Sequence, residues 1–125
     1  MRWPIPTLAA LAVLSGCGGD DKPARTVTVP GDQGVRLEGD EYKFDPGRVI
    51  VTRAPPQLRL ALDNVGTLAH NVRVLDGDRD LGGLRSFSSG EERETTVRIP
   101  PGKYRLVCTV GDHEELGMKG ELEVR

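Results

Sequence analysis

The chain has 125 residues, of which 37% are hydrophobic and only 4% aromatic, and its formal net charge is −2. This length suits one small domain with a largely aliphatic core. The mild charge and the lack of a basic cluster exclude the usual patterns of nucleic-acid binding. The 16 glycines and 9 prolines favour many turns over long helices.

Residues 1–16 are predicted to be a signal peptide. Arg2 precedes an apolar stretch at residues 8–14, which is much shorter than the ~20 residues that span a bilayer. The sequence LSGC at residues 14–17 resembles the lipobox of bacterial lipoproteins. That resemblance implies cleavage before Cys17, lipidation of its thiol, and an exported, extracytoplasmic protein anchored to a bacterial membrane. The alternative is an ordinary signal peptide with an incidental cysteine.

Residues 17–34 are predicted to be the lipidated cysteine and a flexible tether. The stretch GGDDKPARTVTVPGDQG at residues 18–34 is polar and contains glycines and two prolines. Residues 26–29 alternate, so the first strand is an alternative interpretation of this piece. If Cys17 is lipidated, Cys108 has no disulfide partner. A lone thiol in an oxidising compartment is a liability unless it is buried, modified or bound.

From Val35 onward, apolar and polar residues alternate with a period of two, which predicts strands with one buried face. Glycine and proline pairs, such as Gly82-Gly83, predict the turns between them. No stretch has a helical period. Residues 35–125 are therefore predicted to form an all-β antiparallel sandwich or barrel. The predicted inward residues are Leu58, Leu60, Leu62, Val72, Val74, Val97, Ile99, Tyr104, Leu106, Cys108, Leu122 and Val124.

Four residues are candidate metal ligands: His70, Cys108, His113 and Met118. The alternation directs His70 and Cys108 inward at strand ends. A thiolate, two imidazoles and a distant thioether suit copper in both oxidation states. Zinc prefers four good donors, and iron–sulfur clusters need more cysteines. Each residue alone also has a purely structural interpretation, but together they comprise both histidines and the only cysteine outside the lipobox.

Residues 108–120 contain the spacing Cys-x4-His-x4-Met followed by Lys-Gly, and this resembles the copper-binding loop of the cupredoxins, the plastocyanin and azurin group. Residues 64–71 resemble the segment that carries the first histidine of that family. Residues 101–108 resemble the strand that leads to its cysteine, and residues 44–46 resemble its early hairpin. The resemblance covers most of the chain after residue 35.

The resemblance implies a Greek-key sandwich of about seven to eight strands that binds one type 1 copper ion. Cys108, His70 and His113 would form a trigonal plane, and Met118 would be the axial contact. The implied function is not enzymatic. It is that of a one-electron carrier cycling between Cu(II) and Cu(I). A copper enzyme is disfavoured because the chain has only two histidines.

The resemblance also implies that Asn71 supports the site, its backbone N–H donating to the Cys108 sulfur and its side chain binding near Thr109. His113 would be the ligand nearest solvent. Acidic residues flank it, which predicts a transient redox protein partner with a basic docking surface. The protein is expected to be a monomer that binds no nucleic acid. The alternatives are a copper carrier, chaperone or sensor, and a metal-free interaction domain.

Overall fold

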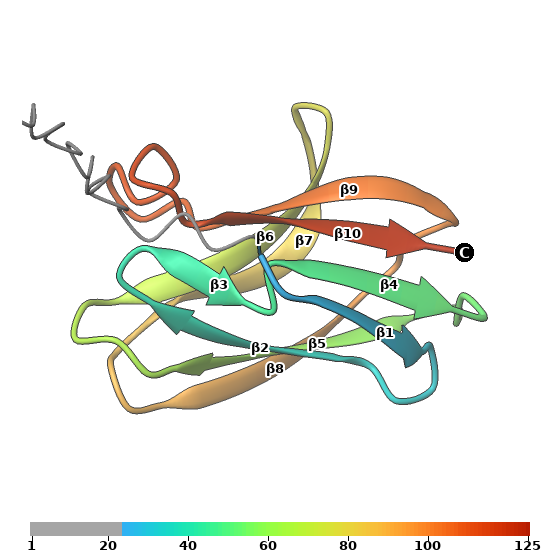
Figure 1. Ribbon diagram of the computed structural model, residues 1–125, viewed down its shortest axis with the longest axis horizontal. Coiled ribbons are helices and arrows are strands. Elements are labelled where there is room, and N and C mark those ends of the chain that lie inside the picture. Colours follow the sequence, from blue (N-terminus) through green and yellow to red (C-terminus); the bar gives the residue numbers. More distant parts are fainter. Residues whose placement is uncertain (1–23) are drawn as a thin grey trace, which may run out of the picture.

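The computed structural model describes residues 24–125, so the predicted signal peptide and Cys17 lie outside the described residues. Ten strands form two facing sheets (Figure 1). In the six-stranded sheet the order is β1 (Thr26–Pro30), β4 (Arg48–Thr52), β10 (Lys119–Val124), β9 (Gly102–Val107), β6 (His70–Asp76) and β7 (Arg79–Phe87). In the four-stranded sheet it is β3 (Lys43–Asp45), β2 (Val35–Asp40), β5 (Leu58–Asn64) and β8 (Glu92–Val97). Within residues 24–125, no helix has the length and apolar character needed to cross a bilayer.

The predicted all-β class is confirmed, but the sheets are mixed and contain more strands than expected. Three neighbouring pairs are parallel: β1 with β4, β4 with β10, and β2 with β5. The chain leaves the six-stranded sheet after β1, forms the β2–β3 hairpin in the other sheet, and returns as β4 in the direction of β1. These crossings between sheets make an entirely antiparallel arrangement wrong.

The predicted tether over residues 17–34 is wrong for most of its described part. Thr26–Pro30 forms β1, which pairs with β4 over its whole length, and the Gly31 N–H continues the pairing by donating to the Thr52 carbonyl at 2.7 Å. Val29 packs against the core. The alternation of threonine and valine in this segment therefore belongs to a strand, and the folded domain begins before Val35.

The core between the two sheets is mostly aliphatic, and alternate residues of the strands build it. Each buried leucine or valine contributes ~1.5–3 kcal/mol relative to exposure. Ala61 and Val107 are buried too, although the alternation places them on the outer faces. Both lie on interior strands, where Ala61 pairs with Arg36 and Glu94, and Val107 pairs with Arg73 and Lys119. The predicted inward residues are all at most 7% exposed: Leu58, Leu60, Leu62, Val72, Val74, Val97, Ile99, Tyr104, Leu106, Cys108, Leu122 and Val124.

The predicted turn at Gly82-Gly83 is wrong, because both residues lie inside β7 at the edge of its sheet. Gly83 pairs with Arg73 of β6 and has a φ of 145°. A Cβ atom added to Gly83 would lie 2.2 Å from the Val72 carbonyl oxygen. Glycine is needed here for the close approach of two backbones rather than for a change of chain direction.

Three connections meet at one end of the sandwich, opposite the C-terminus (Figure 1). They are the turn between β2 and β3, the segment between β5 and β6, and the loop between β9 and β10. All the candidate ligands of the described chain lie in or next to these connections. The fold therefore brings segments that are distant in sequence together at a single pole.

Candidate metal centre

Three of the four predicted ligands come together in the structure. One donor atom each from His70, Cys108 and His113 lies within 4.8 Å of the others, and all three residues are buried. His70 is the first residue of β6, Cys108 directly follows β9, and His113 lies in the loop between β9 and β10. A thiol and two imidazoles thus face one another at the pole of the sandwich.

The loop at residues 108–118 is closed by its own backbone. The Cys108 N–H donates to the Met118 carbonyl at 3.1 Å, and the Met118 N–H donates to the His113 carbonyl at 3.0 Å. The His113 N–H in turn donates to the Val110 carbonyl at 3.0 Å. Met118, the fourth predicted ligand, is therefore fixed beside the other two loop ligands, and its side chain is completely buried.

The separations between donor atoms fit a shared ion. The Cys108 Sγ and the His113 Nδ1 are 3.6 Å apart. A sulfur and a nitrogen bound to one ion at about 2.3 and 2.0 Å, with an angle near 120°, would be about 3.7 Å apart. The rings of His70 and His113 meet edge to face, with centroids 5.1 Å apart. The side chains are thus arranged as ligands of one metal ion without further movement of the backbone.

One nitrogen of the His70 ring forms a hydrogen bond within the described chain, and the other forms none there. Its Nε2 lies 3.1 Å from the Glu41 Oε1, whereas its Nδ1 is buried and makes no hydrogen bond within the described chain. An ionised carboxylate only accepts, so the proton belongs on Nε2 and a lone pair remains on Nδ1. An unpaired buried polar atom costs about 1–3 kcal/mol. A metal ion bound to Nδ1 would remove that cost.

Glu41 is a residue that the sequence analysis missed. It lies in the turn between β2 and β3, 29 residues before His70, and no spacing or motif marks it. Its Oε1 also accepts the backbone N–H groups of Leu68 at 2.7 Å and Thr67 at 2.8 Å. The bond from Leu68 is the main cause that lowers the pKa of Glu41 to about 2, and burial opposes it. The carboxyl group is therefore ionised at neutral pH.

Asn71 connects the strand of one ligand to the loop of another. Its Nδ2 donates to the Thr109 Oγ1 at 2.8 Å, and its Oδ1 accepts the Thr109 backbone N–H at 2.8 Å. The structure thus has the predicted contact between this side chain and Thr109. The pairing of β6 with β7 shifts register between His70 and Val72, and such a bulge allows His70 and Asn71 both to be buried. Donation from the Asn71 N–H to the Cys108 sulfur stays a prediction.

Asn64 organises the segment before His70, a role that the sequence pattern alone did not indicate. Its side chain is completely buried at the end of β5. Its Nδ2 donates to the carbonyls of Leu68 and Phe87, and its Oδ1 accepts the Gly66 N–H at 3.1 Å. Together with Glu41, Asn64 fixes the backbone that leads into His70.

The surface around His113 is partly apolar. His113 is 7% exposed, and the Tyr42 ring lies 5.0 Å from it between centroids. The three exposed large hydrophobic side chains of the described chain all lie in the connections at this pole. They are Val65, Leu68 and Leu116.

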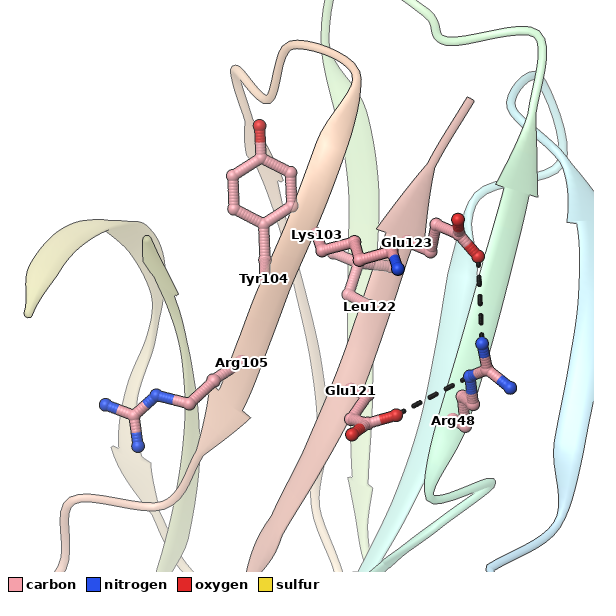
Figure 2. Close-up of a pocket in the computed structure, with 7 residues that line it drawn as sticks. All are labelled: Arg48, Lys103, Tyr104, Arg105, Glu121, Leu122 and Glu123. Atoms are coloured by element: carbon pink, nitrogen blue, oxygen red, sulfur yellow. Dashed lines mark ion pairs between the residues drawn. The ribbon is translucent and has the colours of Figure 1, made fainter. Parts of the chain in front are cut away.

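A separate hollow of about 280 Å³ lies on the six-stranded sheet and is lined by residues of β4, β9 and β10 (Figure 2). Arg48 pairs there with Glu121 at 3.5 Å and with Glu123 at 3.8 Å. None of the four candidate ligands lines the hollow. It is a charged surface feature distinct from the metal centre.

No protein-family model and no curated protein matches the chain. Solved structures do match it. Reduced auracyanin from the photosynthetic bacterium Roseiflexus castenholzii has a TM-score of 0.61 and 19% identity, over 82% of this chain and 99% of that one. Rusticyanin from Thiobacillus ferrooxidans, a copper protein, has a TM-score of 0.58 and 17% identity, over 80% and 82%.

An enzyme is also among the matches. A copper-containing nitrite reductase from Thermus scotoductus has a TM-score of 0.55 and 19% identity, over 80% of this chain but only 28% of that enzyme. Identities this low show a shared fold. The chain has the cupredoxin fold that the sequence resemblance implied.

Proposed function

We propose that the protein is a type 1 copper protein that carries single electrons between redox partners. The observation that carries this proposal is the buried set of one thiol and two imidazoles, with the His70 Nδ1 left unpaired. Copper accepts a thiolate and imidazoles in both of its oxidation states. The fold shared with auracyanin, solved in a reduced form, and with the copper protein rusticyanin supports the same conclusion.

The residues have distinct roles in this proposal. His70 and His113 would bind through their Nδ1 atoms and Cys108 through its Sγ, while Met118 would be a weak axial contact. Bound copper would supply a one-electron couple. The chain supplies rigidity, because β6 and the closed loop at residues 108–118 hold the ligands in place. A site that is already in position changes little between the two oxidation states.

We do not propose that this chain catalyses a reaction by itself. The chain spans about a quarter of the nitrite reductase that it matches. Multicopper enzymes need more histidines than the two in this sequence. We therefore assign it the role of a carrier.

The test is to add Cu(II) to the protein and to record its visible absorption and electron paramagnetic resonance spectra. We expect an intense thiolate-to-copper band and a narrow copper hyperfine splitting, both bleached reversibly by a mild reductant. Met118→Leu should keep copper bound and shift the reduction potential, since a thioether adds little affinity. A colourless protein that exchanges Cu(I) would indicate a copper carrier or sensor. No copper binding and an alkylatable Cys108 would indicate a metal-free domain.

We also propose that a basic redox protein docks at the pole around His113. Asp112 and Glu115 are exposed there and form no ion pair within residues 24–125, whereas Glu114 lies 3.9 Å from Arg105. Apolar side chains lie beside them. Attraction between opposite charges raises the association rate. Salt screens this attraction beyond about 8 Å at physiological ionic strength.

With a basic cytochrome c as the probe, the electron-transfer rate at low protein concentration should fall as salt is raised. Glu115→Gln should slow the reaction at low salt. Glu94→Gln removes the same charge from exposed β8 in the other sheet and should not slow it. A rate that is independent of salt, or equal slowing by both variants, would contradict this docking site.

We further propose that the protein is an exported lipoprotein, anchored through Cys17. Because β1 begins at Thr26, the segment between the lipid and the sheet is shorter than the predicted tether. At about 3.5 Å per residue, it would hold the domain within roughly 30 Å of the bilayer surface. Cys17→Ala should move the protein from the membrane fraction to the soluble extracytoplasmic fraction. Retention of that variant on membranes would show another means of attachment.

A further inference from the structure

We propose that Glu41 is a positioning residue of the metal centre, which holds the His70 ring with Nδ1 toward the metal and lowers the reduction potential through its negative charge. The effect on the reduction potential rests on the proposed copper function. The structural basis is the contact between the Glu41 Oε1 and the His70 Nε2 at 3.1 Å, which joins the β2–β3 turn to the first residue of β6.

The carboxylate is held in place from several sides. The same oxygen that faces His70 accepts the N–H groups of Thr67 and Leu68, and the Glu41 side chain is only 21% exposed. The Glu41 backbone N–H donates to the Asp40 Oδ1 at 2.8 Å. The position of the carboxylate is thus set by the backbone around it and does not depend on a bound metal.

Gly66 leaves the space that the carboxylate occupies. A Cβ atom at this residue would lie 2.6 Å from the Glu41 Oε1 and 2.8 Å from its Oε2. Even alanine at position 66 would therefore force the carboxylate to move. The absence of a side chain at Gly66 and the two backbone donors that follow it together form a cradle for one carboxylate.

This contact has two chemical consequences. Because the carboxylate accepts from Nε2, it keeps the proton there and leaves Nδ1 as the donor atom, and the hydrogen bond also makes that donor more electron-rich. An electron-rich ligand and a nearby negative charge favour Cu(II) over Cu(I). Removing the charge should therefore raise the reduction potential.

The first experiment uses metal-free protein. Nitrogen-15 NMR of the histidine rings at mildly alkaline pH should show His70 with its proton on Nε2. In Glu41→Ala we expect a mixture of the two tautomers, and the copper affinity should fall about 10- to 100-fold. An unchanged His70 tautomer in Glu41→Ala would overturn the positioning role. The tautomer measurement needs no copper, so its result stands even if the proposed copper function fails.

The second experiment measures the redox equilibrium of the copper-loaded protein with a mediator of fixed potential. Glu41→Gln keeps a hydrogen-bond acceptor but removes the charge. We expect it to shift the ratio of reduced to oxidised copper about tenfold toward reduced, which corresponds to about 59 mV for one electron. Glu38→Gln removes an equal charge from an exposed position of β2 and should shift the ratio much less.

Gly66→Ala is the second variant, because it leaves Glu41 in the sequence but displaces its carboxylate. It should shift the ratio in the same direction as Glu41→Gln. Equal shifts in Glu41→Gln and Glu38→Gln, or no shift in Glu41→Gln and Gly66→Ala, would overturn the effect on the potential. A wild-type protein without a thiolate-to-copper band would instead contradict the copper function itself.

Discussion

Cys108→Ser is expected to abolish the visible copper band and to remove most of the rise in melting temperature that copper produces. The band requires a thiolate bound to copper, and Cys108 is the completely buried thiol of the cluster. A metal that binds the folded state stabilises it by about 4 kcal/mol when free metal exceeds its dissociation constant 1,000-fold. Serine is a poor ligand for soft copper, so this stabilisation should disappear. Absorption spectra and melting curves with and without copper measure both effects.

The control is the same substitution at the other cysteine of the sequence. Cys17→Ser should keep the full band and the full copper-dependent stabilisation. The melting temperature of each metal-free variant must also be recorded, because a new buried hydroxyl can itself cost about 1–3 kcal/mol if unpaired. An undiminished band in Cys108→Ser, or its loss in Cys17→Ser, would mean that the thiol ligand has been assigned to the wrong residue.

Gly83→Ala is expected to be the most destabilising small substitution outside the metal centre. The added Cβ would lie 2.2 Å from the Val72 carbonyl oxygen and 2.9 Å from the Arg73 Cα, both of which are backbone atoms of β6. The φ of 145° also disfavours any side chain. Strain and overpacking each cost roughly 1–3 kcal/mol, so the free energy of unfolding should fall by roughly 2–6 kcal/mol. Denaturant titration of the metal-free protein measures this loss.

Gly90→Ala is the matched control for this prediction. Gly90 also has a positive φ, of 82°, but nothing lies within 4 Å of an added Cβ. Gly90→Ala should therefore lower the free energy of unfolding by only about 1 kcal/mol, through backbone strain. If both variants lose similar amounts, the close approach of β6 and β7 is not what requires glycine at position 83. Because β6 also carries His70, Gly83→Ala should weaken copper binding, whereas Gly90→Ala should not.

The alternation of the sequence predicted the buried faces of most strands and directed His70 and Cys108 inward at strand ends. It succeeded because a side chain in a strand points to one of only two faces, and burial selects between them. The contact between Asn71 and Thr109 was expected from the resemblance to cupredoxins. The first feature follows from neighbours in sequence, and the second follows from the motif of a known family.

The features that escaped the sequence analysis depend on contacts between distant segments. The parallel pairs of β4 follow from crossings between the sheets, which no local pattern encodes. The sequence predicts Gly83 in a turn, whereas the close approach of the neighbouring strand β6 is what requires glycine there. Glu41 follows two other acidic residues, Glu38 and Asp40 of β2, and only the folded chain brings it to His70. An alternation with a period of two shows which residues of a strand are buried, but it does not show which strand lies beside it.

The place of β10 has a consequence for the order in which the domain can be completed. β10 follows every other strand in the chain, yet it lies between β4 and β9 in the middle of the six-stranded sheet. Until it is synthesised, β1 and β4 have no connection within that sheet to β9, β6 and β7. A chain that lacks β10 therefore cannot assemble this sheet, and long-range pairing of this kind is slow. Met118 immediately precedes β10, so the last of the four candidate ligands and the strand that completes the sheet are synthesised one after the other, and the full ligand set should bind metal only after β10 has been made.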